Sequence, residues 1–152
     1  MNNTAVIAKF YSSFNAHDSN GMTECYADNI VFEDPAFGVL KGDEAKSMWR
    51  MLMKGTDVKV TFSNVVANEK TGSADWVATY TFGKTGRTVV NKVHAVFEFN
   101  DGKIIRHTDT FDFQVWSRQA LGVSGLLLGW TSYLKKKVND QALVRLKQFM
   151  EK

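Results

Sequence analysis

The spacing of apolar residues changes near residue 56, and this change limits the possible folds more than any other feature of the chain. Before it, apolar residues recur every three or four positions, which is typical of amphipathic helices. After it, apolar and polar residues alternate, which predicts strands with one buried face. Helices followed by a run of strands predict an α+β fold in which a curved sheet wraps the helices.

Helix-capping residues, together with glycine and proline, predict where the individual helices and strands begin and end. Helices are expected over residues 4–16, about 19–26 and about 43–54, because polar capping residues precede each of them. A short strand is expected over residues 30–34, where Pro35 ends it. Four long antiparallel strands are then expected at about 58–63, 75–82, 87–99 and 103–115.

The C-terminal part returns to helical spacing after a glycine-punctuated stretch. Residues 121–129 are expected to form a hinge or a mobile cover. The helix that follows carries one apolar stripe: Trp130, Leu134, Val138, Ala142, Leu146 and Phe149. Such a stripe usually packs against the rest of the protein or a partner. We favour this interpretation over a basic helix lying on a membrane surface.

Length and charge bound the organisation and the partners. The 152 residues suit one domain, residues 1–152, with a core over about 4–116 and a C-terminal extension over about 117–152. The formal charge of +3 arises in the extension, since residues 130–152 carry +4 and residues 1–129 carry −1. A nearly neutral body does not favour nucleic-acid binding, which is therefore not expected.

Cysteine content and hydropathy indicate the compartment. Cys25 is the only cysteine, so no intrachain disulfide can form and a reducing compartment is expected. One cysteine and three scattered histidines predict no metal site, and no cofactor is expected. The N-terminus lacks a signal-peptide pattern, and no apolar run reaches the roughly 18 residues that span a bilayer. These features predict a cytoplasmic protein.

The turn at Asp101-Gly102 joins the last two expected strands, and its loop length decides which residues those strands bring together. A two-residue loop pairs Asn100 with Lys103 and carries Arg106 into the apolar face. A three-residue loop pairs Phe99 with Lys103 and keeps apolar and polar residues on separate faces. The three-residue loop is therefore the favoured register.

In that register His107 lies opposite Ala95, and Asp109 lies opposite Val93. His107 and Asp109 then point inward on an apolar face, with Cα atoms roughly 6.5–7 Å apart. Burial raises the pKa of a carboxyl group, whereas a neighbouring imidazolium lowers it, so such a pair can move a proton near neutral pH. Three roles stay open for the pair: catalysis, lining of a pocket without chemistry, and a purely structural hydrogen bond.

The order of elements, together with Val31-Phe32-Glu33-Asp34-Pro35, Asp101-Gly102-Lys103-Ile104 and His107-Thr108-Asp109, resembles the SnoaL-like branch of the nuclear transport factor 2-like superfamily. The likeness covers about residues 4–116. It implies a cone in which three N-terminal helices pack in a curved antiparallel sheet, with a C-terminal helix added. It also implies homodimers and an apolar pocket for a small hydrophobic, polyketide- or terpenoid-like molecule.

The same resemblance implies roles for three polar residues. Asp34 matches the position of the general base of ketosteroid isomerases, although an aspartate before Pro35 also suits a plain turn. Asp109 matches the acid/base aspartate of polyketide cyclases, and His107 would orient it. These matches imply acid/base isomerase, cyclase or hydrolase chemistry without a metal; a non-catalytic ligand-binding or dimeric association domain is the alternative.

Other positions depart from the family's enzymes. The tyrosine of the isomerases falls at Phe10, next to Tyr11, and Ala95 stands where their second oxyanion donor would be. Steroid isomerisation is therefore not expected. The arginine-dependent epoxide opening is not expected either, because Arg106 falls on the outer face. The residues expected to contact a ligand share inward, mostly aromatic side chains: Phe10, Tyr11, Trp49, Tyr80, Ala95, Phe97 and Phe111.

Overall fold

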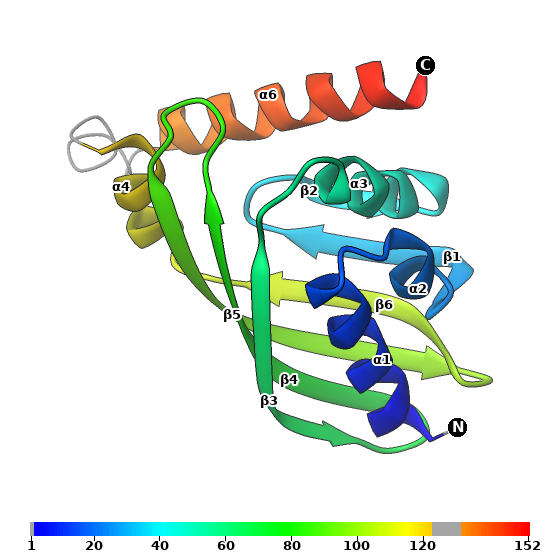
Figure 1. The fold of residues 1–152 in the computed structure, drawn as a ribbon. Coiled ribbons are helices and arrows are strands. Elements are labelled where there is room, and N and C mark those ends of the chain that lie inside the picture. Colours follow the sequence, from blue (N-terminus) through cyan, green and yellow to red (C-terminus); the bar gives the residue numbers. More distant parts are fainter. Residues whose placement is uncertain (1, 123–131) are drawn as a thin grey trace.

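The computed structural model describes residues 2–122 and 132–152, and its main feature is a curved sheet with helices on its inner side (Figure 1). The helices are α1 (Asn3–Asn15), α2 (Ser19–Thr23), α3 (Asp43–Met53), α4 (Phe113–Leu121) and α6 (Ser132–Met150). The strands are β1 (Tyr26–Asp34), β2 (Gly38–Lys41), β3 (Lys59–Ala67), β4 (Thr71–Thr81), β5 (Thr88–Asn100) and β6 (Lys103–Thr110). They form one sheet in the order β2-β1-β6-β5-β4-β3. The predicted α+β class is confirmed.

Helix α1 provides the inner layer of the core. Its N-terminus is capped by Asn2, whose side-chain oxygen accepts a hydrogen bond of 2.9 Å from the Ala5 N–H. Its buried face carries apolar residues at helical spacing: Val6, Ile7, Phe10, Tyr11 and Phe14. This face packs against β3 and β4, so the inward residues of those strands complete the main core.

The sheet is mixed, and the expectation of a wholly antiparallel sheet was wrong. Strand β1 pairs antiparallel with β2, which the sequence had not revealed, and parallel with β6. The pairs β3–β4, β4–β5 and β5–β6 are antiparallel, as predicted. Alternation of apolar and polar residues shows which face of a strand is buried but not its direction. Strand β1 therefore had no sequence signal for its parallel partner.

The β5–β6 hairpin has a two-residue loop, so the favoured three-residue loop was wrong. Asp101 and Gly102 both have positive φ, 50° and 75°, which suits a tight turn of the I′ type. Asn100 pairs with Lys103, and a β-bulge at Ile105 then shifts the register by one residue. The bulge restores the inward face that the three-residue loop would have produced.

The bulge changes the partners of the two inward polar residues. His107 lies opposite Phe97 instead of Ala95, and Asp109 lies opposite Ala95 instead of Val93. Both side chains are buried, with 0% and 3% of their surface exposed, so the prediction that they point inward is confirmed.

The last strand is shorter than the expected range of about 103–115. Strand β6 ends at Thr110, and α4 begins at Phe113 because Asp112 caps it by accepting a hydrogen bond from the Val115 N–H at 3.1 Å. Leu121 ends α4, and Gly122 follows with a φ of 68°. The remainder of the expected hinge, residues 123–129, lies outside the described residues, as does Trp130 of the predicted stripe.

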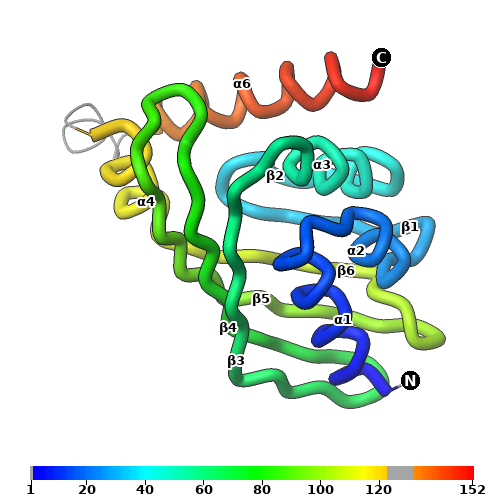
Figure 2. Tube along the Cα trace, in the orientation of Figure 1, coloured from blue at the N-terminus to red at the C-terminus, as the bar shows by residue number. Residues whose placement is uncertain are grey.

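Helix α6 crosses the open side of the fold and packs against α3 (Figure 1). Leu146 joins the main core, and Leu134 is also buried. The trace in Figure 2 shows α6 ending above α3, far from the N-terminus. The predicted packing of this helix is confirmed for its described residues. No helix in residues 2–122 and 132–152 is long and apolar enough to cross a membrane.

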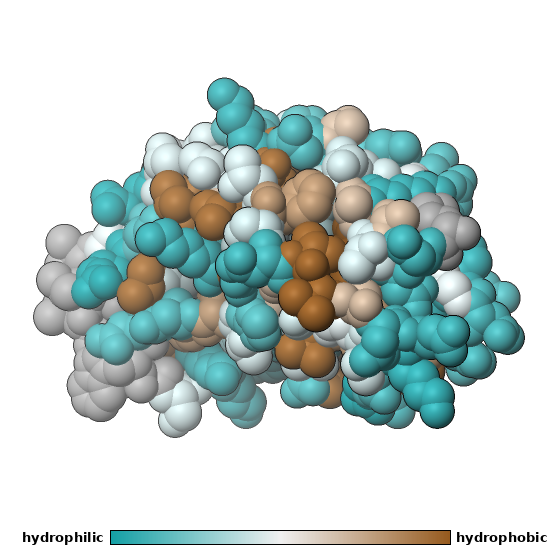
Figure 3. Space-filling model, turned by 90° about the horizontal axis from the view of Figure 1, so that it is seen from below, coloured by the Kyte–Doolittle hydropathy of each residue, from teal (hydrophilic) through white to brown (hydrophobic). Residues whose placement is uncertain are grey.

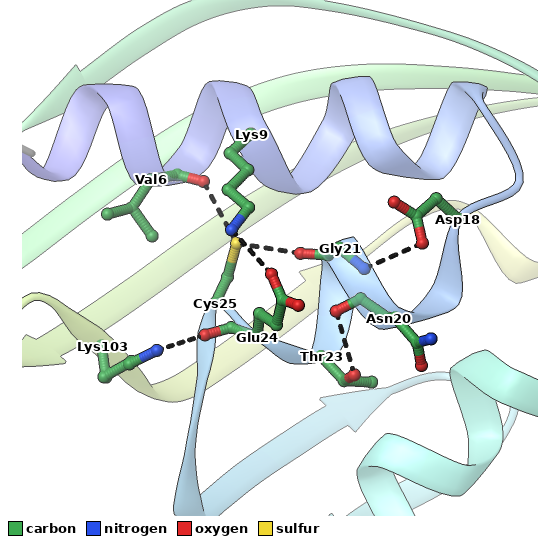
Figure 4. Close-up of polar contacts among 9 residues, drawn as sticks. All are labelled: Val6, Lys9, Asp18, Asn20, Gly21, Thr23, Glu24, Cys25 and Lys103. Atoms are coloured by element: carbon green, nitrogen blue, oxygen red, sulfur yellow. Dashed lines mark hydrogen bonds and ion pairs between the residues drawn. The ribbon is translucent and has the colours of Figure 1, made fainter.

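The single cysteine has a structural position between α1 and α2 (Figure 4). The Cys25 thiol is within hydrogen-bonding distance of the Gly21 carbonyl, 3.4 Å, and the Val6 carbonyl, 3.7 Å. Burial raises the pKa of this thiol to about 11, so the reactive thiolate is scarce at neutral pH. Nearby, Lys103 donates to the Glu24 carbonyl at 2.5 Å and ties the β5–β6 hairpin to this corner.

Candidate functional site

The parallel pairing of β1 and β6 brings two carboxylates together. Phe32 pairs with His107 and Glu33 with Thr108, so Asp34 and Asp109 are the next residues of the two strands. Neighbouring strands lie about 4.8 Å apart, and residues two apart share a face. Asp34 therefore follows Phe32, and Asp109 follows His107, on the inner side of the sheet. The two predicted acid/base residues are neighbours.

His107 lies in an aromatic enclosure above this pair. Five rings surround its imidazole, with centroid distances from 4.6 to 6.5 Å: Phe10, Tyr26, Phe32, Trp49 and Phe97. The interior at this level is filled with side chains. A polar residue in such a place requires hydrogen-bond partners, since an unpaired buried group costs roughly 1–3 kcal/mol.

Those partners form a relay that ends on Asp109. The Trp49 indole N–H donates to the Tyr26 hydroxyl oxygen at 2.9 Å, and the Tyr26 oxygen lies 2.7 Å from His107 Nδ1. His107 Nε2 lies 2.8 Å from Asp109 Oδ1. Every group is satisfied when the Tyr26 hydroxyl donates to Nδ1 and the imidazole carries its proton on Nε2, which donates to Asp109.

Asp109 is held by a second donor as well. The Trp76 indole N–H donates to the same Oδ1 atom at 3.3 Å. Among the described residues, the Oδ2 atom of Asp109 has no hydrogen-bond partner, and this residue lines a cleft. One oxygen is thus anchored by His107 and Trp76, while the other is available to a bound molecule.

Asp34 is anchored in a similar way by its own turn. Its Oδ1 atom accepts hydrogen bonds from the backbone N–H groups of Ala36 at 2.9 Å and Phe37 at 2.6 Å. Burial raises the pKa of the Asp34 carboxyl to about 7; the Phe37 hydrogen bond opposes this, and the negative charge of Asp109 adds to it. Asp34 therefore exchanges its proton near neutral pH, beside a carboxylate held by donors.

The cleft beside the two carboxylates has a volume of about 540 Å³, which suits one small molecule. It lies between the ends of β1 and β6 and the first turns of α6. Its described lining residues are Glu33, Asp34, Pro35, Gly38, Thr108, Asp109, Thr110, Ser132, Lys135, Lys136 and Asn139. Within residues 2–122 and 132–152, no three His, Cys, Asp or Glu side chains are placed to hold a metal ion.

The residues expected to contact a ligand lie deeper than this cleft, and its described lining includes none of them. Five of the seven are fully buried in the main core: Phe10, Tyr11, Trp49, Ala95 and Phe97. Tyr80 and Phe111 are half-buried where the main core meets a smaller cluster around Trp116. The Tyr80 hydroxyl accepts a hydrogen bond of 2.7 Å from Trp116.

Tyr11 differs from the other core residues in one respect. Its hydroxyl is the one buried side-chain polar atom without a hydrogen-bond partner in the described part of the chain. Burial and the nearby charge of Asp109 raise the pKa of this hydroxyl well above its usual value, so it stays protonated. Tyr11 therefore places an unused donor near Asp109.

Sequence reasoning missed several of the residues that build the site. Trp76 carried a usable signal, because a buried indole N–H needs an acceptor and this residue alternates inward. Tyr26 fell at the end of an expected helix, so its place beside His107 was not foreseen. Lys135 and Lys136 of α6 line the cleft, and the apolar stripe of this helix gave no signal for their position.

Comparison with known proteins agrees with this architecture. Residues 7–107, about two thirds of the chain, match the family of the SnoaL-like domain. The chain belongs to the SnoaL-like family. The match begins within α1, continues through the strands as far as His107, and ends before Asp109, α4 and α6. No curated protein matches this SnoaL-like chain.

Solved structures show the same nuclear transport factor 2-like fold as this SnoaL-like chain. A candidate polyketide cyclase from Silicibacter sp. TM1040 is 17% identical, with a TM-score of 0.70, over 78% of this chain and 95% of that one. An LEH-like epoxide hydrolase from M. tuberculosis is 20% identical, with a TM-score of 0.66, over 87% and 94%. An NTF2-like protein of unknown function from Burkholderia pseudomallei is 19% identical, with a TM-score of 0.64, over 74% and 92%.

Proposed function

We propose that this chain binds a small apolar carbonyl compound, of polyketide or terpenoid type, in the cleft and transfers protons through Asp34 and Asp109. The observation that carries the proposal is the pair of neighbouring carboxylates, each with one oxygen anchored. Neighbouring acids in different environments commonly divide acid and base roles. Structural neighbours described as candidate polyketide cyclases and an epoxide hydrolase support this class of substrate.

The proposed steps follow from the two environments. The Asp109 carboxylate, oriented by His107, removes a proton from the carbon next to a carbonyl group, and the C–H electron pair becomes the new C=C bond of an enol. Asp34, protonated on about half of the molecules near pH 7, donates its proton to the carbonyl oxygen. Return of a proton at another carbon gives an isomer, and attack of the enol on a second carbonyl gives a ring.

Epoxide opening of the arginine-dependent kind is not favoured. Arg106 lies on the outer face of the sheet, where its Nε atom pairs with Glu98 Oε2 at 3.0 Å. It is therefore held away from the two carboxylates of the cleft.

A direct test is deuterium exchange into the α-carbon of 2-tetralone, an apolar ketone, followed by proton NMR in D₂O. The protein is expected to accelerate exchange above the uncatalysed rate, and Asp109→Asn is expected to lower the catalysed rate by about 100-fold or more. Asp34→Asn should lower it as well. Asp75→Asn is the matched control, since Asp75 also pairs with a histidine but lies on the outer face. Wild-type rates in both cleft variants would contradict the proposal.

Ligand binding without turnover is the second candidate, and the filled aromatic enclosure around His107 favours it. A ligand that cannot enter this enclosure reaches the carboxylates only from the cleft side. NMR titration with 2-tetralone separates the two functions. Chemical-shift changes at Asp34 and Thr108 without any deuterium exchange would indicate a binding protein.

We also propose that the chain forms a homodimer through the outer face of the sheet. Val66, Ser73 and Val96 lie in one row across β3, β4 and β5, and the two valines are exposed. The view from below shows apolar surface gathered near the centre within a hydrophilic surround (Figure 3). Light scattering should give the mass of a dimer for the wild type and of a monomer for Val96→Lys. A monomeric wild type would contradict this proposal.

A further inference from the structure

The C-terminal helix supplies one wall of the cleft, although it lies outside the part that matches the SnoaL-like family. Three contacts fix α6 in this position. Asn139 donates a hydrogen bond to the Ala36 carbonyl at 2.8 Å, and Leu146 is buried in the main core. The Lys54 ammonium lies 5.2 Å from the centre of the Phe149 ring. The wall is therefore a positioned element of the fold.

The face of α6 that meets the cleft is polar and carries positive charge. Its described lining residues follow helical spacing on one side of the helix: Ser132, Lys135, Lys136 and Asn139. Lys137 belongs to the same run of lysines but is not part of the lining. The sequence pattern thus turns two of the three lysines toward the cleft and one away from it.

Within residues 2–122 and 132–152, these two cations have no carboxylate partner. Among the described residues, no carboxylate oxygen lies within 4.0 Å of the Lys135 or Lys136 ammonium group. Three carboxylates line the other side of the cleft, Glu33, Asp34 and Asp109, and of these Asp34 and Asp109 have their own donors. A molecule in the cleft therefore meets carboxyl groups at one end and, at the other, two ammonium groups that have no carboxylate partner in the described part of the chain.

We infer that Lys135 and Lys136 bind a carboxylate group of the ligand, so that the ligand is an apolar oxo acid rather than a neutral ketone. This inference rests on the proposed function, because it names the substrate class of the same cleft. The carboxylate would lie against α6, and the reacting carbonyl would lie against Asp34 and Asp109. Ammonium groups attract a carboxylate strongly where part of the surrounding water is displaced.

A matched pair of probes tests the inference: 2-naphthoate and 2-naphthamide share their rings and differ in charge. Their dissociation constants would be measured by NMR titration at neutral pH and low salt. The wild type is expected to bind 2-naphthoate about ten-fold more tightly than 2-naphthamide, and added salt should weaken this preference. The Lys135→Gln/Lys136→Gln double variant should bind both probes equally.

Lys137→Gln is the control, because it removes one charge from the same helix without changing the cleft lining. It should keep the preference for 2-naphthoate, apart from a small loss of long-range attraction. Equal affinities in the wild type, or an unchanged preference in the double variant, would overturn the inference. Catalysed exchange of 2-tetralone would be unaffected by that failure, so the proposed function is tested separately. Binding of neither probe would overturn the inference, and the exchange of 2-tetralone would still decide the proposed function.

Discussion

Two histidine–aspartate pairs lie on opposite faces of the same sheet, and their comparison shows what makes the inner one a candidate site. His107 and Asp109 are joined at 2.8 Å, and His94 and Asp75 at 2.7 Å. The inner side chains are 0% and 3% exposed, whereas the outer ones are 53% and 44% exposed. The bond lengths are therefore nearly equal, and the surroundings differ.

The outer pair is a surface contact. Water competes for both partners, and Asn64 donates a further hydrogen bond to Asp75 at 2.8 Å. The inner pair is enclosed by aromatic rings and extended by Tyr26 and Trp76, so the orientation of Asp109 is fixed. A histidine–aspartate distance alone thus does not indicate function. Function is indicated by an aromatic enclosure on one side of the pair together with a cleft on the other.

The largest effect is expected from His107→Ala. This change leaves a cavity among the rings and removes one hydrogen-bond partner each from Tyr26 and Asp109, so the free energy of unfolding should fall by about 3–5 kcal/mol. Urea unfolding followed by circular dichroism measures the loss. His94→Ala, the matched change in the outer pair, should leave the unfolding midpoint unchanged within error. Similar losses in the two variants would show that the pairs do not differ in energetic role.

The second effect concerns pH and Asp34. Its pKa is about 7 in the folded protein against 3.8 for the unfolded group, so the folded protein binds this proton more tightly. The contribution of this proton to the free energy of unfolding is complete below about pH 4 and is lost as pH rises through about 7. At 1.36 kcal/mol per pKa unit, the total loss is up to about 4 kcal/mol. Asp34→Asn, which can keep the turn hydrogen bonds, should be more stable than the wild type at pH 8 and similar to it at pH 3.

Asp75 sharpens this contrast because its dependence has the opposite sign. Hydrogen bonds from His94 and Asn64 lower the pKa of the Asp75 carboxyl. The contribution of Asp75 to the free energy of unfolding is therefore present above the pKa of the unfolded group and is lost as pH falls. The Asp75→Asn variant should lack only this loss of stability at acid pH. Urea midpoints measured from pH 3 to pH 8 for both variants test the two signs together. The same sign in both variants would contradict the assigned environments.

The smallest effect separates two buried tyrosines. Tyr26→Phe removes the acceptor of the Trp49 N–H and the donor to His107, so it should cost about 1–2 kcal/mol of unfolding free energy. Tyr11→Phe removes a hydroxyl without a partner in the described part of the protein and should be neutral or stabilising by up to about 1 kcal/mol. Guanidinium unfolding compares them, and a larger loss for Tyr11→Phe would contradict the relay.

Much of the inner face could be predicted from the sequence because alternation reports burial directly. His107 and Asp109 were placed inward correctly even though the loop length was wrong, since the bulge at Ile105 adds one residue and compensates for the shorter loop. A bulge of this kind has no clear sequence signal. The cross-strand partners Phe97 and Ala95 therefore could not be assigned correctly.

The proximity of Asp34 to Asp109 could not be predicted from pattern alone. It depends on the parallel pairing of β1 with β6, which joins segments about 75 residues apart in the chain. The residues of α6 that line the cleft could not be predicted from the pattern either. The apolar stripe of α6 predicted a packed helix, but a stripe does not indicate what the opposite face meets, so the place of Lys135 was missed. We propose that this extension and the core form one domain, since Leu146 lies in the main core.

The most direct measurement is the titration of the Asp34 carboxyl carbon by ¹³C NMR. The side-by-side carboxylates predict a midpoint near pH 7 in the wild type. They also predict a lower midpoint in Asp109→Asn, because the negative charge of Asp109 is one cause of the raised pKa of Asp34. A wild-type midpoint near pH 4 that Asp109→Asn leaves unchanged would contradict the acid/base pair.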